Sequence, residues 1–108
     1  MTETNGLIHC VAFTWLPATP AAAIEAVAAG LSELRQHLGL PDYHFGPDLG
    51  LAIGNADFGV VARFPSEEAW RRYMDHPEHR QLINQRVQPI LAAKASFQIP
   101  SGPQSAPH

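Results

Sequence analysis

The chain has 108 residues, which is enough for one domain around a single hydrophobic core and too few for two. Its composition, 45% hydrophobic and only 16% charged, is typical of an ordered globular protein with little charged surface. The formal net charge is -3 and the seven lysine and arginine residues are scattered, so the basic footprint of a protein that binds nucleic acid or anionic lipid is absent. We therefore expect neither nucleic acid nor a membrane among its partners.

The only cysteine, Cys10, lies inside an apolar run and has no second cysteine with which to form an intrachain disulfide. No apolar run approaches the roughly 18 to 20 residues of a membrane span. The first residues, MTETNG, are polar and lack the basic residues of a secretory signal. Together these features favour a reducing, cytoplasmic location.

Residues 7–15 (LIHCVAFTW) predict a β-strand, because two sets of side chains alternate along them. His9, Val11 and Phe13 share one face, and the residues between them form a second face that is also apolar. A strand with two apolar faces must be covered on both sides. His9 is then either a hydrogen-bonded core histidine or part of a pocket wall.

The sequence predicts three helices, because apolar side chains recur at three- and four-residue steps and capping residues lie at the ends of these segments. Residues 20–38 predict a first helix that ends at Gly39. Ser66 caps a second helix that stops at about Asp75, and Pro77 starts a third. The stripe of the first helix is Ile24, Val27, Leu31, Leu34 and Leu38, and that of the third is Leu82, Ile83, Val87 and Ile90, with Pro89 marking its end.

The remaining segments predict three further strands and a tail. Residues 43–50 read as a short strand, interrupted by a glycine and a proline that suit the edge of a sheet. After a Gly-Asn turn at 54–55, residues 58–64 predict the second strand of a hairpin. Residues 92–99 supply a last strand, and residues 100–108 lack apolar periodicity, so we expect a flexible C-terminal tail.

The order strand, helix, strand, strand, helix, strand predicts an α+β, ferredoxin-like βαββαβ subunit, a single domain over residues 1–99. In this layout the helices cover one face of the sheet only. Because the first strand is apolar on both faces, a second copy of the chain is the economical cover for the other face. The pattern therefore predicts a homodimer.

The histidines at 76 and 79 raise three alternatives. Three residues apart on one helix, they would share a face suitable for a metal, but Pro77 interrupts that helix and no H-E-x-x-H pattern is present, so we expect no metal site. Histidine titrates near neutral pH, so His79 could accept a proton while the Tyr73 hydroxyl donates to a developing oxyanion. For His76 the competing interpretation is structural, namely capping of a helix end.

Three segments resemble the stress-responsive dimeric α/β barrel (Dabb) family. They are IHCVAFTW at the start, DFGVVARFPSEEAWRRYMDHPEHRQL at residues 57–82, and the apolar last strand. The most specific element is F-x-S-x-E-x-W-x-x-Y-x-x-H-P-x-H, from Phe64 to His79. The resemblance implies a ferredoxin-like subunit that pairs through its sheet into a dimeric α/β barrel.

The resemblance also implies roles for individual residues. In plant polyketide cyclases similar to this family, the second histidine of H-P-x-H is the general base and the tyrosine assists it, which points to His79 and Tyr73 as catalytic residues. In those cyclases the histidine of the first strand lines the same pocket, so the resemblance points to His9 as a pocket residue. We take His9, Phe13 and His76 as candidate substrate-binding residues for a small hydrophobic or aromatic molecule, with no cofactor.

Two other functions remain open at this point. One is a non-catalytic, stress-related dimer that binds a ligand or a protein partner, since the H-P-x-H motif also builds the helix junction that the fold needs. The other is a monooxygenase-like enzyme, because a similar dimeric barrel is used for that chemistry.

Overall fold

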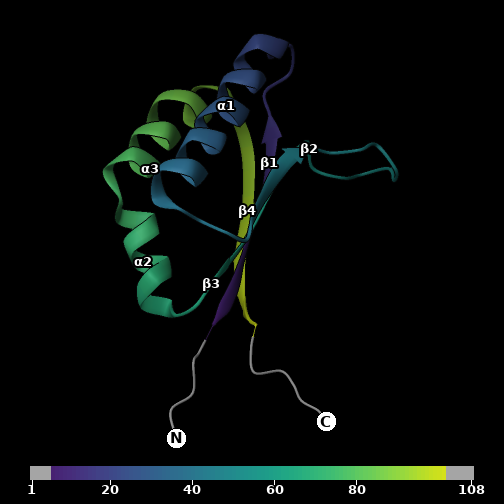
Figure 1. Cartoon of the computed structure of the whole chain (residues 1–108). Helices are drawn as coiled ribbons and strands as arrows, with labels where there is room; N and C mark the ends of the chain where they lie inside the picture. The colour runs from purple at the N-terminus through teal and green to yellow at the C-terminus, as the bar shows by residue number, and fades with distance from the viewer. Residues whose placement is uncertain (1–5, 102–108) are drawn as a thin grey trace, which may run out of the picture.

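The structure, a computed structural model, describes residues 6–101. Their elements are β1 (Leu7–Trp15), α1 (Ala21–Leu38), β2 (Tyr43–Pro47), β3 (Phe58–Phe64), α2 (Glu67–Asp75), α3 (Pro77–Leu82) and β4 (Leu91–Pro100). The strands form one antiparallel sheet in the order β2-β3-β1-β4. The helices all cover the same face of this sheet (Figure 1). The predicted α+β, ferredoxin-like arrangement is thereby confirmed.

The hydrophobic core fills the space between the sheet and the helices. Alternation along β3 turns every second side chain toward the helices, and these are Phe58, Val60, Ala62 and Phe64. From the helix side, α1 contributes Val27 and Leu34, both fully buried. Gly39 ends α1 as predicted, in the left-handed conformation with φ 63°, which costs a glycine no steric strain.

Two strand boundaries differ from the prediction. β2 is an edge strand as expected, but its pairing with β3 ends at Pro47, which lies opposite Phe58. β4 continues to Pro100, which pairs with Leu7 and so belongs to the sheet rather than to a tail. Of the predicted tail, Ser101 donates its backbone N–H to the Gly6 carbonyl at 3.0 Å, and residues 102–108 lie outside the described residues.

The helical path that begins at Pro77 changes its hydrogen-bonding pattern along its length. After α3 ends at Leu82, a π-helical turn spans Ile83–Val87 and a 3-10 turn spans Gln88–Ile90. A π-helical turn widens the helix locally and is frequent at functional sites. The predicted apolar stripe is kept, with Leu82 and Val87 buried.

The opposite face of the sheet has no covering layer within the described residues. The side chains that alternate with the core-facing ones on β1, β3 and β4 point to it, and they include Ile8, Cys10, Ala12, Val61, Ala93, Ala95, Phe97 and Ile99. Phe97 is 56% exposed, and Val61 and Ile99 are each 45% exposed. A contiguous apolar face of this kind marks an interaction surface.

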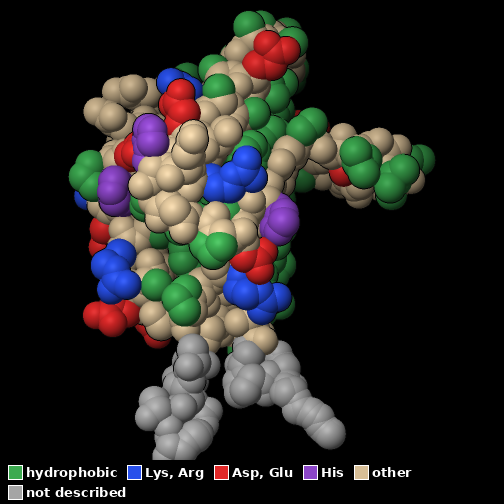
Figure 2. Space-filling model, in the orientation of Figure 1, with side chains coloured by type: hydrophobic (Ala, Val, Ile, Leu, Met, Phe, Trp, Pro, Cys, Tyr) green, Lys and Arg blue, Asp and Glu red, His purple; other side chains and the backbone are tan. Residues whose placement is uncertain are grey.

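A long connection between β2 and β3, residues 48–57, projects from the sheet on the side opposite the helices (Figure 1). We call it the arm. Three large apolar side chains stand almost fully in solvent along it: Leu49 is 82%, Leu51 84% and Ile53 103% exposed. Figure 2 shows hydrophobic side chains gathered at the end of the arm.

Candidate functional site

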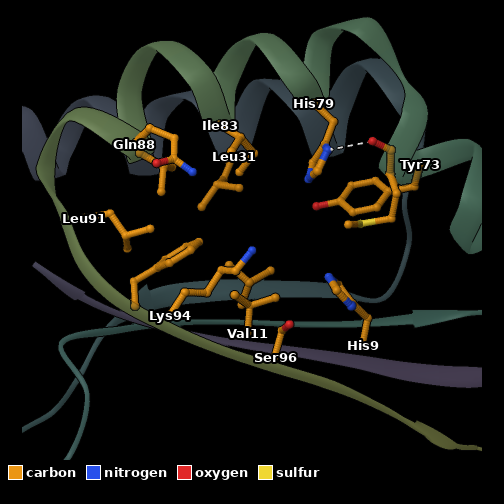
Figure 3. A pocket seen from close by; sticks show the side chains of 14 residues that line it. His9, Val11, Leu31, Tyr73, His79, Ile83, Gln88, Leu91, Lys94 and Ser96 are labelled. Carbon is orange, nitrogen blue, oxygen red and sulfur yellow. Dashed lines mark hydrogen bonds between the residues drawn. The ribbon is translucent and has the colours of Figure 1, made fainter.

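A cavity of about 130 Å³ lies between the sheet and the helices. β1 and β4 form its floor, and the helices form its roof (Figure 3). Most of its wall is apolar, including Val11, Phe13, Leu31, Ile83 and Leu91. An engineered cavity of about 150 Å³ accepts benzene, so this space suits one ring-sized apolar group.

His79 enters the cavity from α3, and only 8% of it is exposed. Its Nδ1 lies 3.2 Å from the backbone carbonyl oxygen of Met74, the contact dashed in Figure 3. Because a carbonyl oxygen only accepts, Nδ1 carries the proton and Nε2 keeps a lone pair. Burial lowers the pKa of His79 below its ordinary value, and the positive charge of Lys94 acts in the same direction. The ring is therefore neutral at pH 7 and has one nitrogen available as a base.

His9 faces the same cavity from β1 and is fixed in the opposite tautomer. Its Nδ1 accepts from the indole N–H of Trp70 at 3.2 Å and from the Gln98 amide at 3.0 Å. An indole nitrogen can only donate, so the proton of the neutral His9 ring must sit on Nε2. Burial lowers the pKa of His9 to about 4, with the positive charge of Lys94 acting in the same direction, so the ring stays neutral.

Tyr73 lies between the two histidines. Its ring centroid is 4.5 Å from that of His79 and 6.1 Å from that of His9. Its hydroxyl is 2.6 Å from the hydroxyl of Tyr43, and either oxygen can be the donor. Burial raises the pKa of Tyr43 to about 12 and raises the pKa of Tyr73 further above its ordinary value. Both phenols therefore keep their protons and act as hydrogen-bonding groups.

Polar side chains line the part of the cavity next to β4. Lys94 pairs with Phe13 and Ser96 pairs with Val11 across the sheet, so both project toward the helices. Gln88, from the 3-10 turn, lines the cavity as well. No acidic side chain lines this cavity in the described part of the chain. The site thus combines an apolar wall with a neutral histidine pair and one cationic group.

The structure brings four of the five sequence-predicted residues together: His9, Phe13, Tyr73 and His79 line one cavity. His76 does not line it. Its Nδ1 accepts the backbone N–H of Glu78 at 3.1 Å, which caps the start of α3. His76 therefore lies outside the cavity and caps a helix, but not in the expected way: we expected its imidazole to bond carbonyls at the end of the preceding helix, and it instead accepts an N–H at the start of α3.

Several residues of the site were missed from the sequence alone. Lys94, Ser96 and Gln98 alternate along β4, so the pairing of β4 with β1 could have placed them beside His9 and Phe13. Trp70 lies one helical turn before the predicted Tyr73, which was a second available signal.

No three His, Cys, Asp or Glu side chains within residues 6–101 come close enough together to bind a metal ion. None of the helices in that same range is both long and apolar enough to cross a membrane.

We expect the two imidazoles to show opposite tautomers in nuclear magnetic resonance spectra at pH 7. The ring nitrogen shifts should place the proton on Nε2 in His9 and on Nδ1 in His79, because their partners are an obligate donor and an obligate acceptor. The His9 signal should stay in the neutral position down to about pH 4, and the His79 signal should stay there to below pH 6.5.

The control is Trp70→Phe, which removes the indole donor and should admit the other tautomer of His9. Two rings in the same tautomer would contradict the assignment.

The lowered pKa of His9 also sets the direction in which stability changes with pH. An unfolded histidine takes up a proton near pH 6.5 and folded His9 does not, so stability is full above pH 6.5 and falls as the pH drops toward 4.

Comparison with known proteins places this site in a family. The model of the Dabb family, the stress responsive A/B barrel domain, matches residues 7–99. No curated protein matches the chain. Among solved structures, a dimeric ferredoxin-like protein of unknown function from Thermobifida fusca is 36% identical, with a TM-score of 0.83, over 94% of this chain and 95% of its own.

Two more distant structures share the fold. A Dabb family protein from Mesorhizobium loti is 21% identical with a TM-score of 0.73, over 91% of this chain and 99% of its own. A hydroxynitrile lyase from Passiflora edulis is 12% identical with a TM-score of 0.75, over 97% and 100%. Since the family model spans the sheet, the helices and the histidine cavity, this chain belongs to the stress responsive A/B barrel domain family.

Proposed function

We propose that the protein is a homodimer that binds a small apolar or aromatic carbonyl compound and catalyses cofactor-free proton transfer at carbon, of the polyketide cyclase type. The observation that carries the proposal is the pair of neutral histidines in opposite tautomers. His79 offers a lone pair and His9 offers an N–H to the same apolar cavity. A base and a donor in one shielded space are what enolate formation requires.

In the reaction that this geometry supports, Nε2 of His79 takes a proton from the carbon next to a carbonyl. The electron pair moves to the carbonyl oxygen, where the His9 Nε2–H donates to the developing negative charge. When the Tyr43 hydroxyl donates to Tyr73, the Tyr73 hydroxyl is also available as a donor. The enolate carbon then attacks a second carbonyl of the same molecule, and the new alkoxide takes the proton back from His79. The reaction involves no net oxidation or reduction, so it needs no oxidant or redox cofactor.

Burial of the site supports both roles. His9 and Tyr73 are each 3% exposed, so bulk water does not compete for the developing oxyanion. In this low-dielectric space a hydrogen bond to an anion is stronger than in water. The lowered pKa of His79 keeps its lone pair unprotonated at neutral pH, at some cost in basicity.

The uncovered apolar face of the sheet supports the homodimer. Its most exposed large hydrophobic side chain is Phe97 of β4, which lies next to Cys10, Ala95 and Ile99. The Thermobifida fusca protein, 36% identical over nearly the whole chain, is dimeric by its description. The hydroxynitrile lyase shows only that an enzyme exists among proteins of this fold.

Deuterium exchange tests the chemistry without a known substrate. In heavy water, we expect the wild-type protein to speed up exchange of the acidic carbon-bound protons of phenylacetone and benzoylacetone. His79→Ala should reduce the rate by about 10²–10⁴-fold, the usual contribution of a general base. The rate should fall as the pH drops, with a midpoint below 6.5 because the pKa of His79 is lowered.

The matched control is His76→Ala, which removes a cap outside the cavity and should cost stability without loss of exchange in the folded protein. Circular dichroism of each variant separates lost catalysis from lost folding. A wild-type protein that binds these ketones but leaves their exchange rate unchanged would support the non-catalytic, ligand-binding alternative instead.

For the homodimer, sedimentation equilibrium should give twice the chain mass of 11.8 kDa at micromolar concentration. Phe97→Glu places a charge in the centre of the apolar face and should yield a monomer, because an unpaired buried charge costs several kcal/mol. Gln81→Glu adds the same charge on the solvent side of α3 and should leave the dimer intact. A monomeric wild type would defeat this part of the proposal.

A further inference from the structure

Lys94 is the only lysine in the chain. Its amino group points into the cavity between the sheet and the helices (Figure 3). Pairing with Phe13 sets this direction, because directly opposed residues of antiparallel strands share a face. The neighbours Ala93 and Ala95 point to the other face of the sheet. The chain therefore places its single lysine on the wall of the site.

The charge of Lys94 has no counterion within the described residues. No acidic side chain lines the cavity, and none of the ion pairs found in residues 6–101 includes Lys94. The two histidines beside it are neutral, and the lysine charge is one cause of the lowered pKa of each. A single fixed positive charge thus faces a cavity whose other lining side chains are uncharged at neutral pH.

We propose that the ligand of this cavity is a small carboxylic acid with one ring-sized apolar group, and that Lys94 binds its carboxylate. The inference rests on the proposed function and specifies its ligand. The apolar group fits the space near Leu31 and Ile83, and Ser96 and Gln88 line the cavity with hydrogen-bonding groups for the acid. Lys94 is exposed to solvent, so the carboxylate lies at the mouth and keeps part of its hydration.

Phenylacetate and phenylacetamide test the inference, because they share a shape and differ in charge. Their dissociation constants can be followed through the imidazole signals of His9 and His79. We expect wild-type protein to bind the acid about tenfold more tightly than the amide, as a charge-assisted hydrogen bond provides. Lys94→Met should remove that preference by weakening binding of the acid about tenfold. Lys94→Arg should keep the preference.

Arg80→Met is the matched control, since it removes a positive charge from the exposed side of α3, away from the cavity. It should leave the preference intact. Equal binding of acid and amide by wild type, or a preference that survives in Lys94→Met, would overturn the role of Lys94 while leaving the ligand-binding cavity standing. If neither probe shifts the imidazole signals, the inference fails, and the exchange rates of phenylacetone and benzoylacetone decide the proposed function separately.

The arm at residues 48–57 carries a second, independent inference. It is held in one shape by Asp48, whose carboxylate accepts the Gly50 N–H at 2.8 Å and the Asn55 side-chain N–H at 3.0 Å. The Asp48 N–H donates to the Asp57 carbonyl at 2.8 Å, and this hydrogen bond joins the two ends of the arm where it leaves the sheet. A fixed arm holds Leu49 and Ile53 out in solvent instead of folding them onto its own subunit.

We infer that the arm of each subunit packs against a second copy of the chain. It projects on the side of the uncovered sheet face, where the proposed dimer places that copy (Figure 1). Contact there would bury the three side chains that a monomer leaves in water, Leu49, Leu51 and Ile53. The arm is thus continuous with the sheet interface and extends it.

The double variant Leu51→Asp/Ile53→Asp should raise the dimer dissociation constant at least tenfold in sedimentation equilibrium. Ala52→Asp is the control, because it adds a charge to the same arm and removes no large apolar side chain. A dimer whose dissociation constant is unchanged in the double variant would overturn this inference alone. A monomeric wild type would overturn it together with the homodimer.

Discussion

The break that Pro77 imposes on the helical path is the constraint on which the site depends. In an uninterrupted helix the Glu78 N–H would donate to the Met74 carbonyl, four residues earlier. Here the Glu78 N–H donates to the imidazole of His76 instead, which leaves the Met74 carbonyl without a backbone donor. The Nδ1–H of His79 takes that place. One interruption therefore both ends α2 and fixes which nitrogen of the proposed base carries the proton.

Because of this arrangement, a structural and a functional account of H-P-x-H are not competing explanations. The first histidine, His76, caps the start of α3 through its Nδ1. The second, His79, donates from Nδ1 to a carbonyl at the end of α2, which leaves its Nε2 available to the cavity. α2 also contacts the histidine on the opposite wall of the cavity, His9. Trp70 orients His9 through its indole N–H, and Tyr73, one turn further along, packs between His9 and His79. A single short helix thus holds both imidazoles in their tautomers.

How far the sequence predicted this structure depends on how local each signal was. The alternation of residues 7–15 and the proline at 77 act within a few residues, so they predicted the strand and the helix junction. The shared cavity of His9 and His79 was expected from the family resemblance, not from these local patterns. The partner of Tyr73 is 30 residues away, on a strand weakened by glycine and proline, and no local pattern pointed to it. The inward direction of Lys94 depends on the register between β1 and β4, which only the assembled sheet defines.

β4 connects the chemistry to the assembly. Its inward side chains, Lys94 and Gln98 among them, touch the ligand space or orient His9, whereas its outward side chains, including Phe97, form the uncovered apolar face. As an edge strand, β4 pairs with a single strand, β1, among the strands of residues 6–101. Strand edges open more easily than central strands. A second subunit that covers the outward face would hold β4 in place, and with it the hydrogen bond from Gln98 to His9. In the proposed dimer, therefore, each partner stabilises the donor side of the other's site by covering the outward face of β4.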